Sequence, residues 1–222
     1  MNYADWKWAD YFYPDTYDSE FQNGTLRNLY GLHNFDDLRE WEYEDTHKRI
    51  RELRANSDLV EKTYDAAHLR AIHAYLFQDV YEWAGQYRTV DMSKGHSFFF
   101  RTQIDKWLDD AHKVIQDTSW SSLDQEAFAD ACAGVFARVN QAHPFREGNG
   151  RTSKIFMEHV SELSCFTLNW ARIPPDEWNR CSDISSMALN QHDPESAIEA
   201  LSPLFYDAAM LCTHPLHILS KP

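Results

Sequence analysis

A short stretch near the middle of the chain combines the residue types that transfer of a phosphate-containing group requires. It reads His143-Pro-Phe-Arg-Glu-Gly-Asn-Gly-Arg151. His143 titrates near neutral pH, so its neutral imidazole can take a proton from an attacking hydroxyl. Glu147 is a hard oxygen ligand, suited to a Mg²⁺ ion that keeps several waters and bridges phosphates. A candidate base and a candidate metal ligand therefore lie close together in sequence.

The rest of the stretch is suited to an anion. Gly148 and Gly150 let the backbone turn tightly and approach a ligand without a Cβ clash. Their N–H groups and that of Asn149, at the start of a helix, can converge on a phosphate. Arg151 adds a planar fork that matches phosphate oxygens. Each residue alone has a structural explanation, but their joint occurrence predicts phosphoryl or nucleotidyl transfer.

Two helices must flank this loop. Apolar residues at helical spacing predict a helix that begins at Ser122 as N-cap and stops near Ala142. It must stop there because the residue before Pro144 is pushed out of helical geometry. The following helix is predicted to begin at Asn149–Arg151 and to run to Leu163.

The remaining pattern predicts more helices and one hairpin. Residues 36–53 suggest a helix, and Asp65 is expected to cap another whose end is marked by Gly85. Partial alternation between residues 87 and 100 predicts a short β-hairpin around Ser93-Lys94-Gly95. Further helices are expected at about 102–118, after Pro174-Pro175 and after Pro194. The predicted fold is therefore an all-α helical bundle with one small β-hairpin.

Composition excludes several classes of protein. The net charge of −14 makes the surface repel nucleic acid and anionic membranes. No apolar run approaches the length of a membrane span, and the N-terminus does not read as a signal peptide. The four cysteines lack metal-ligand spacing and do not suggest a disulfide framework. We therefore expect a soluble protein of a reducing, cytoplasmic compartment.

The stretch resembles the signature of the Fic family, His-Pro-Phe-x-(Asp/Glu)-Gly-Asn-Gly-Arg-x-x-Arg, which His143 to Arg151 match without a gap. The segments Leu76–Gly85 and Tyr87–Val90 resemble the helix that leads into the hairpin flap of that family. Asn140 and Asn190 also stand at positions that resemble the pattern of that family. The resemblance covers about residues 36–205, which we take as the Fic domain. Residues 1–35, rich in aromatics, are expected to form a packed arm, and residues 206–222 a helix end and tail.

The resemblance implies a protein adenylyltransferase that moves AMP from Mg-ATP to a Tyr, Thr or Ser hydroxyl of a target protein. It implies His143 as the base, Glu147 as the Mg²⁺ ligand, and Arg151 as the group that stabilises the leaving pyrophosphate. The other nucleotide-binding residues it implies are Phe145, Gly148, Asn149, Gly150, Lys154 and Asn190. The flap is expected to pair with the extended backbone of the target through Ser93, Lys94, Gly95, His96, Ser97 and Phe98.

Two departures from the family pattern affect these expectations. The final Arg of the motif is Lys154 here, which keeps the charge but loses the bidentate fork. Many members also carry an inhibitory helix, Ser/Thr-x-x-x-Glu-Gly/Asn. Ser57–Glu61 is followed by Lys62, and Ser122–Glu126 by Ala127, so neither segment completes that pattern. This resembles the toxin-like branch, in which a separate small antitoxin supplies the helix.

The leading hypothesis is therefore a bacterial AMP-transferring toxin that acts in the cytoplasm, with delivery into another cell left open. One alternative is transfer of another phosphate-containing group by the same fold. A second is a nucleotide-binding adaptor without catalysis, although binding alone does not require the base His143.

Overall fold

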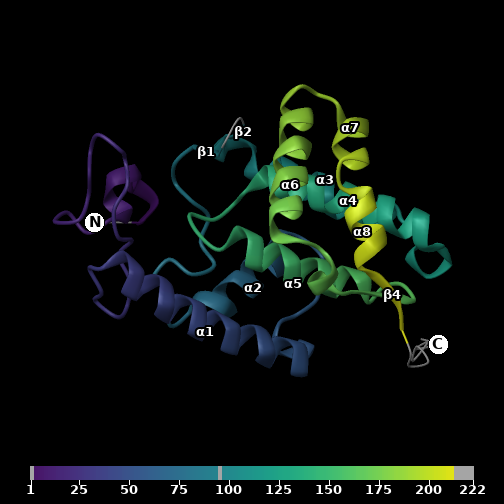
Figure 1. The fold of residues 1–222 in the computed structure, drawn as a ribbon, viewed down its shortest axis with the longest axis horizontal. Coiled ribbons are helices and arrows are strands. Elements are labelled where there is room, and N and C mark those ends of the chain that lie inside the picture. The colour runs from purple at the N-terminus through teal and green to yellow at the C-terminus, as the bar shows by residue number, and fades with distance from the viewer. Residues whose placement is uncertain (1–2, 95–96, 213–222) are drawn as a thin grey trace.

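In the computed structural model, the residues described are 3–94 and 97–212. Helix α4 (Gln125–Ala142) lies at the centre and contacts α3 (Ile104–Asp117), α5 (Asn149–Ser161), α6 (Pro175–Asn190), α7 (Pro194–Glu199) and α8 (Ser202–Ala208). Its inner faces carry small residues, among them Ala129, Ala133 and Gly134, which are buried. Small side chains let several helices approach one axis closely. The predicted all-α bundle is confirmed (Figure 1).

A second layer is formed by α1 (Phe35–Ala55) and α2 (Ala66–Phe77), which pack on each other, while α2 also packs on α5. Asn34 caps α1 by accepting hydrogen bonds from the N–H groups of Asp36 and Asp37. Asp65 caps α2 through the N–H of His68, as predicted. Helix α1 runs along the lower edge of the molecule, as Figure 1 shows.

The predicted hairpin is present. Strand β1 (Met92–Lys94) pairs antiparallel with β2 (Ser97–Phe99), so that Ser93 lies opposite Phe98. Gly95 and His96, which the prediction placed in its turn, lie outside the described residues. Strand β2 contacts α6, so one side of the hairpin rests on the bundle.

Two expectations about local structure were wrong. The helix expected to reach Gly85 ends at Phe77, because the Phe77 carbonyl accepts from the N–H groups of both Val80 and Tyr81 and turns follow. Ser122 does not cap α4, because its hydroxyl donates to the Ser119 carbonyl; Asp124 takes that role.

A second antiparallel pair, between β3 (Phe166–Leu168) and β4 (Ala209–Leu211), was not predicted. Strands this short carry too little alternation to be distinguished from loop.

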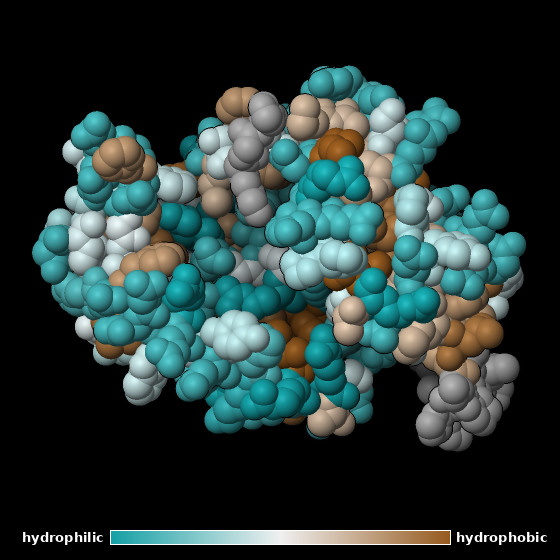
Figure 2. All heavy atoms as spheres, viewed as in Figure 1, coloured by the Kyte–Doolittle hydropathy of each residue, from teal (hydrophilic) through white to brown (hydrophobic). Residues whose placement is uncertain are grey.

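The N-terminal residues lie beside the bundle (Figure 1). Tyr11 and Phe12 are buried, and Leu29 N–H donates to the Val80 carbonyl. Figure 2 shows hydrophilic residues over most of the visible face, with hydrophobic patches between them. Within the described residues, no helix is both long and apolar enough to cross a membrane.

Candidate active site

His143 is the first residue after α4 and has an uncommon backbone conformation. Its φ of 39° and ψ of 56° lie in the left-handed region, and its N–H donates to the Val139 carbonyl at 3.2 Å. That region costs a non-glycine residue about 1–2 kcal/mol. Surrounding contacts must therefore maintain the turn that ends the helix and presents the imidazole.

The imidazole lines a cavity of about 310 Å³ between α4, α5, α6 and β2. The Phe99 ring of β2 stacks on it, with 4.5 Å between ring centroids. Asn140 lies in the same wall and donates to the Ser182 carbonyl at 3.0 Å and to Ser186 Oγ at 2.8 Å. The other lining residues are Phe136, Gly150, Ser153, Trp178, Asn179, Arg180 and Asp183.

The two glycines of the loop serve different needs. Gly148 has a φ of 82°, and a Cβ on it would lie 2.2 Å from an atom of the Phe77 ring. Gly150 lines the cavity with His143, and apart from its own helix no atom lies within 4 Å of the position its Cβ would take. The fold therefore requires Gly148, whereas Gly150 leaves room for a ligand.

Asn149 and Phe145 hold the loop together. Asn149 Oδ1 accepts from the Phe145 N–H at 2.9 Å, and Asn149 Nδ2 donates to the Phe145 carbonyl at 2.7 Å. The Phe145 ring is fully buried against His73. The side chain of Asn149 is therefore used to maintain the loop. What this residue still offers to an anion is its main-chain N–H in the first turn of α5.

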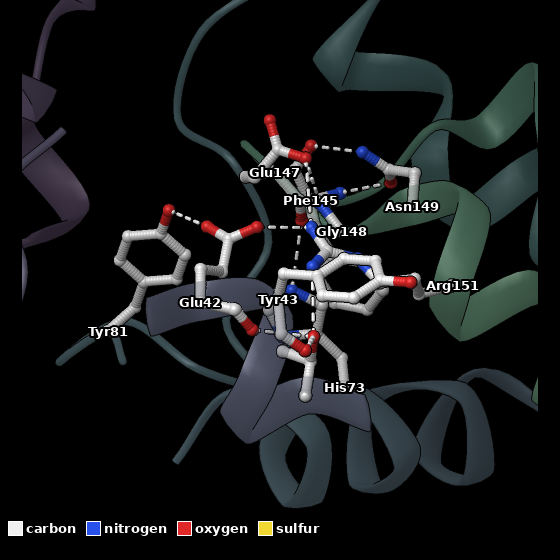
Figure 3. Close-up of polar contacts among 10 residues, drawn as sticks. Glu42, Tyr43, His73, Tyr81, Phe145, Glu147, Gly148, Asn149 and Arg151 are labelled. Carbon is white, nitrogen blue, oxygen red and sulfur yellow. Dashed lines mark hydrogen bonds and ion pairs between the residues drawn. The ribbon is translucent and has the colours of Figure 1, made fainter. Parts of the chain in front are cut away.

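Glu147 and Arg151 point to the other side of the loop. Their side chains line a separate cavity of about 440 Å³ together with residues of α1. Arg151 forms a short ion pair with Glu42 and donates to Thr46 Oγ1 at 3.0 Å (Figure 3). Glu147 Oε1 lies 3.4 Å from Arg151 Nη2 and accepts from the Gly148 N–H at 2.9 Å.

The expected site residues thus divide between two cavities on either side of one loop. His143 and Gly150 line the first, and Glu147 and Arg151 line the second. Sequence spacing did not reveal the partner of Arg151, because Glu42 lies 109 residues earlier in the chain.

Lys154 lies in the second turn of α5, beside two indole rings. Its Nζ is 5.0 Å from the ring centre of Trp178 and 5.4 Å from that of Trp170. Burial lowers the pKa of Lys154, and the negative charge of Glu158 partly opposes this effect. Trp178 also lines the cavity of His143, so Lys154 lies behind that wall.

Asn190 does not line the cavity. Its Oδ1 accepts from Gln141 Nε2 at 2.9 Å, and the same Gln141 nitrogen donates to the Phe98 carbonyl at 3.1 Å. Ser97 Oγ donates to Asp183 Oδ1 at 2.8 Å. Asn190 and the flap are therefore connected through Gln141, and the flap is fixed to α6.

Sequence reasoning missed three residues that hold the loop. His73 is buried on α2, and its Nδ1 accepts from the Gly85 N–H at 2.8 Å. Its Nε2 must then carry the proton, which it donates to the Glu147 carbonyl at 3.0 Å. Burial lowers the pKa of His73 to about 3. The other two residues are buried cations, Arg88 and Arg146.

A long sequence separation hides all three. Arg88 contacts the carbonyl of His143, 55 residues away. Arg146 lies over aromatic rings of the arm, with its Cζ 4.2 Å from the ring centre of Trp8. The only sequence signal for the two arginines is that Arg146 stands within the motif and Arg88 beside the hairpin, and surface charges occur in such places too.

The residues present are compatible with a Mg²⁺ ion that carries phosphates. Glu147 is partly exposed, and within the described chain the hydrogen bonds and the ion pair of its carboxylate all use Oε1, which leaves Oε2 available. No group of three or more His, Cys, Asp or Glu suited to a metal occurs among the described residues. This is consistent with Mg²⁺ bound through one carboxylate, water and phosphate oxygens.

Comparison with known proteins agrees with these features. The model of the Fic/DOC family matches residues 63–161. The probable protein adenylyltransferase y4lH of Sinorhizobium fredii is 34% identical over 166 residues, which are 73% of this chain and 80% of that protein. The probable protein adenylyltransferase Fic of Salmonella typhimurium is 30% identical, with the same two shares of 73% and 80%. The protein adenylyltransferase VbhT of Bartonella schoenbuchensis is 31% identical over 72% of this chain, which spans only 34% of its length.

Solved structures show the same fold with nucleotides. BepC, a VirB-translocated effector of Bartonella tribocorum with bound AMPPNP, superposes with a TM-score of 0.74 at 26% identity, covering 91% of this chain and 97% of that one. The Fic domain of a Bartonella quintana effector with bound ADP gives 0.76 at 26% identity, covering 92% and 96%.

Proposed function

The chain belongs to the Fic/DOC family, and we propose that it is a protein adenylyltransferase that moves AMP from ATP to a hydroxyl side chain of another protein. The relatives at 30–34% identity carry the name of that activity, and solved structures with the same fold hold AMPPNP or ADP. The observation that carries the proposal is the cavity in which the His143 imidazole and the open face of Gly150 meet.

The reaction we propose uses the two sides of the loop together. His143 takes the proton of the target hydroxyl, whose oxygen attacks the α-phosphorus of ATP. A bond from target oxygen to phosphorus forms, the bond from that phosphorus to the β-phosphate oxygen breaks, and pyrophosphate leaves. The N–H groups of Asn149 and Gly150 in the first turn of α5 offer hydrogen bonds and a positive dipole end to the phosphates.

Glu147 is the group we propose for Mg²⁺, which when bound would neutralise phosphate charge. We assign Arg151 to the leaving pyrophosphate, a role that requires its guanidinium to exchange Glu42 for phosphate oxygens. Lys154 and Asn190 stay candidate nucleotide contacts, although in this structure their side chains face Trp178 and Gln141.

The flap supplies the surface for the target. Strand β2 rests on α6 and on Gln141, whereas β1 pairs only with β2 among the described residues. We propose that an extended segment of the target adds to the edge at β1, which brings its hydroxyl toward His143.

We further propose that a separate antitoxin restrains the protein. Ser57 to Leu59 and Trp120 to Ser122 form short 3-10 turns, so neither candidate segment from the sequence builds an inhibitory helix. The proposed place of action is the bacterial cytoplasm, with delivery into another cell as a second possibility. The related Bartonella structures are described as VirB-translocated effectors.

The test uses ATP labelled at the α-phosphate and a bacterial cell extract as the source of acceptor proteins. We expect label on protein, with a mass increase equal to AMP, and a loss on the order of 10²–10⁴ in rate in the His143→Ala variant. AMPPNP affinity, measured by calorimetry, should change little, because the base acts on the target.

The matched control is His112→Ala. It removes a part-buried imidazole on α3, which contacts the Tyr64 carbonyl. It should retain the parent rate. A mass increase equal to phosphate would contradict nucleotidyl transfer. No mass increase at all would favour the alternative that the protein is a nucleotide-binding adaptor without catalysis.

A further inference from the structure

The buried Arg88 guanidinium lies between the loop after α4 and the segment that leads into β1. Its Nε donates to the His143 carbonyl at 2.7 Å, and its Nη2 to the Ala142 carbonyl at 3.3 Å. Its Nη1 donates to the Val90 carbonyl, and its own N–H to the Pro144 carbonyl at 2.8 Å. One side chain therefore contacts both the base residue and the entry to the flap.

These contacts provide hydrogen-bond partners for carbonyls at the end of α4. The last carbonyls of a helix have no partner within the helix. The left-handed turn at His143 and the following Pro144, which lacks an N–H, leave no continuing chain to supply one. A cation at a helix C-terminus also interacts favourably with the helix dipole.

Arg88 makes no ion pair with a carboxylate within the described chain. Only 3% of the residue is exposed, and burial lowers its pKa to about 10, so it keeps its charge at neutral pH. The charge faces main-chain carbonyls. This arrangement is more specific than a surface ion pair, because the planar fork fixes the relative positions of Ala142, His143 and Val90.

The geometry has a direct consequence for the reaction. The imidazole of His143 contacts Phe99 on β2, while its carbonyl is held by Arg88, which also holds Val90 before β1. A base must reach the attacking hydroxyl within about 2.6–3.2 Å. The target hydroxyl is presented by the flap in the function proposed above.

We propose that Arg88 is a positioning residue for the transfer reaction, which sets the distance between the base and the flap. The inference rests on the proposed function for its effect on rate, but not for its effect on the His143 ring. An ammonium in its place is a single point charge and cannot serve three carbonyls in the same plane.

The experiment compares Arg88→Lys with Arg138→Lys. Arg138 is part-buried and, like Arg88, donates to a main-chain carbonyl, that of Gly134, but it lies on the far side of α4 beside α3. We measure label transfer from ATP, AMPPNP affinity by calorimetry, and the imidazole signals of His143 by NMR, assigned with His143→Ala.

For Arg88→Lys we expect a fall of about 10²-fold in kcat, with AMPPNP affinity within about twofold of the parent because no Arg88 atom lines the nucleotide cavity. The His143 signals should shift in this variant and stay unchanged in Arg138→Lys. Folding is checked by circular dichroism. If Arg88→Lys does not fold, Arg88→Gln, which keeps one donor for the His143 carbonyl, takes its place.

Unchanged kcat together with unchanged His143 signals would overturn the inference. A parent that transfers no AMP would refute the proposed function instead, and the NMR comparison would still decide whether Arg88 positions the ring. A fall in kcat equal to that of Arg138→Lys would also overturn the inference, because it would reflect general loss of packing.

Discussion

Arg151, which we propose to bind the leaving pyrophosphate, is held by α1 in this structure. Its guanidinium is held by Glu42 and Thr46 of α1 and lies near Glu147, as Figure 3 shows. Glu42 also accepts a hydrogen bond from the Tyr81 hydroxyl and is largely buried. A phosphate that is to bind Arg151 must therefore compete with a carboxylate already in place.

Replacing Glu42 with Gln should raise the affinity for ATP, because a neutral amide competes less well for the guanidinium. The same change should lower the free energy of unfolding by about 1–3 kcal/mol, since a charge-assisted bond in a largely buried site is lost. Calorimetry and thermal unfolding measure the two effects.

The control is Glu52→Gln, which alters a similar ion pair to Arg49 on the same helix. It should reduce stability without changing ATP affinity. A fall in ATP affinity in Glu42→Gln would show that Arg151 anchors α5 to α1 and does not bind phosphate.

The sequence predicted a loop between two helices but not the directions of the side chains on it. Because the motif is consecutive in sequence, His143, Glu147 and Gly150 must lie close together on one loop, independently of the rest of the fold. Which cavity each side chain faces depends on α1 and α6, which come from distant segments. Pairs such as Arg151 with Glu42 carry no local signal that could have predicted them.

At the level of elements, α2 fixes the loop through His73. This imidazole connects the Glu147 carbonyl to the Gly85 N–H and stacks on Phe145 at a centroid distance of 3.8 Å. His73→Phe keeps the ring packing but leaves both main-chain groups without their partner. We expect the free energy of unfolding to fall by about 2–6 kcal/mol, from two groups left without a partner at about 1–3 kcal/mol each.

Urea unfolding of the His73→Phe variant measures this loss, and Mg²⁺ titration of ATP binding should show weaker metal dependence because Glu147 is no longer held. A variant as stable as the parent would mean that water replaces the imidazole.

Helices α2 and α5 also enclose a pair of neutral histidines. The Tyr64 N–H donates to His68 Nδ1, so His68 Nε2 carries a proton and donates to His159 Nδ1 at 2.9 Å. Burial lowers the pKa of His68 to about 3 and that of His159 to about 4, from 6.5. Protonating His159 at Nδ1 would break this bond, and protonating His68 at Nδ1 would break the bond that it accepts from Tyr64.

The free energy of unfolding should therefore depend on pH, with a sign that follows from the lowered pKa values. Below pH 6.5 the unfolded chain binds protons that the folded chain does not, so the free energy of unfolding falls as pH drops from 6.5 toward 4. Above pH 6.5 the contribution of the pair is fully present. Thermal unfolding between pH 4 and 7.5 measures the slope, which should be smaller in His68→Gln; an equal slope would assign it to other groups.

The element boundaries illustrate what local pattern can predict. Caps such as Asp65 and the stop at Ala142 were correct because they depend on neighbouring residues. The end of α2 was placed too late: the chain turns after Phe77, and the Val80 carbonyl beyond the helix accepts from Leu29 N–H of the arm. Tertiary contacts of this kind override periodicity.

At the scale of the whole molecule, the N-terminal arm contacts two segments next to the site: the loop after α4 and the residues that lead into the hairpin. Arg146 of the loop lies over the rings of Trp8, Tyr11 and Phe12. The Tyr11 hydroxyl meets Thr89 Oγ1 at 3.0 Å, just before the flap. The arm therefore packs against the catalytic loop and the base of the hairpin together.

Trp8→Ala should remove the nearest ring from the Arg146 guanidinium and lower stability by about 1–2 kcal/mol, the range for a desolvated cation–π contact. It should also lower the transfer rate, because Arg146 neighbours Glu147. Trp41→Ala, at an exposed position on α1, is the control and should change neither quantity. A Trp8→Ala variant with lower stability and the parent rate would restrict the arm to a role in folding.

The two glycines of the loop suggest how descendants of this protein would diverge. Any lineage that keeps the aromatic ring of Phe77 must keep Gly148, whether or not it retains catalysis, because an added methyl group would collide with that ring. A Cβ on Gly150 would meet no atom outside its own helix, so the fold leaves room there for a larger side chain, which would obstruct the nucleotide that we propose. Under relaxed selection, mutations should accumulate at Gly150 first. A homologous sequence with Gly148 intact and Gly150 replaced would then mark a pseudoenzyme that still folds.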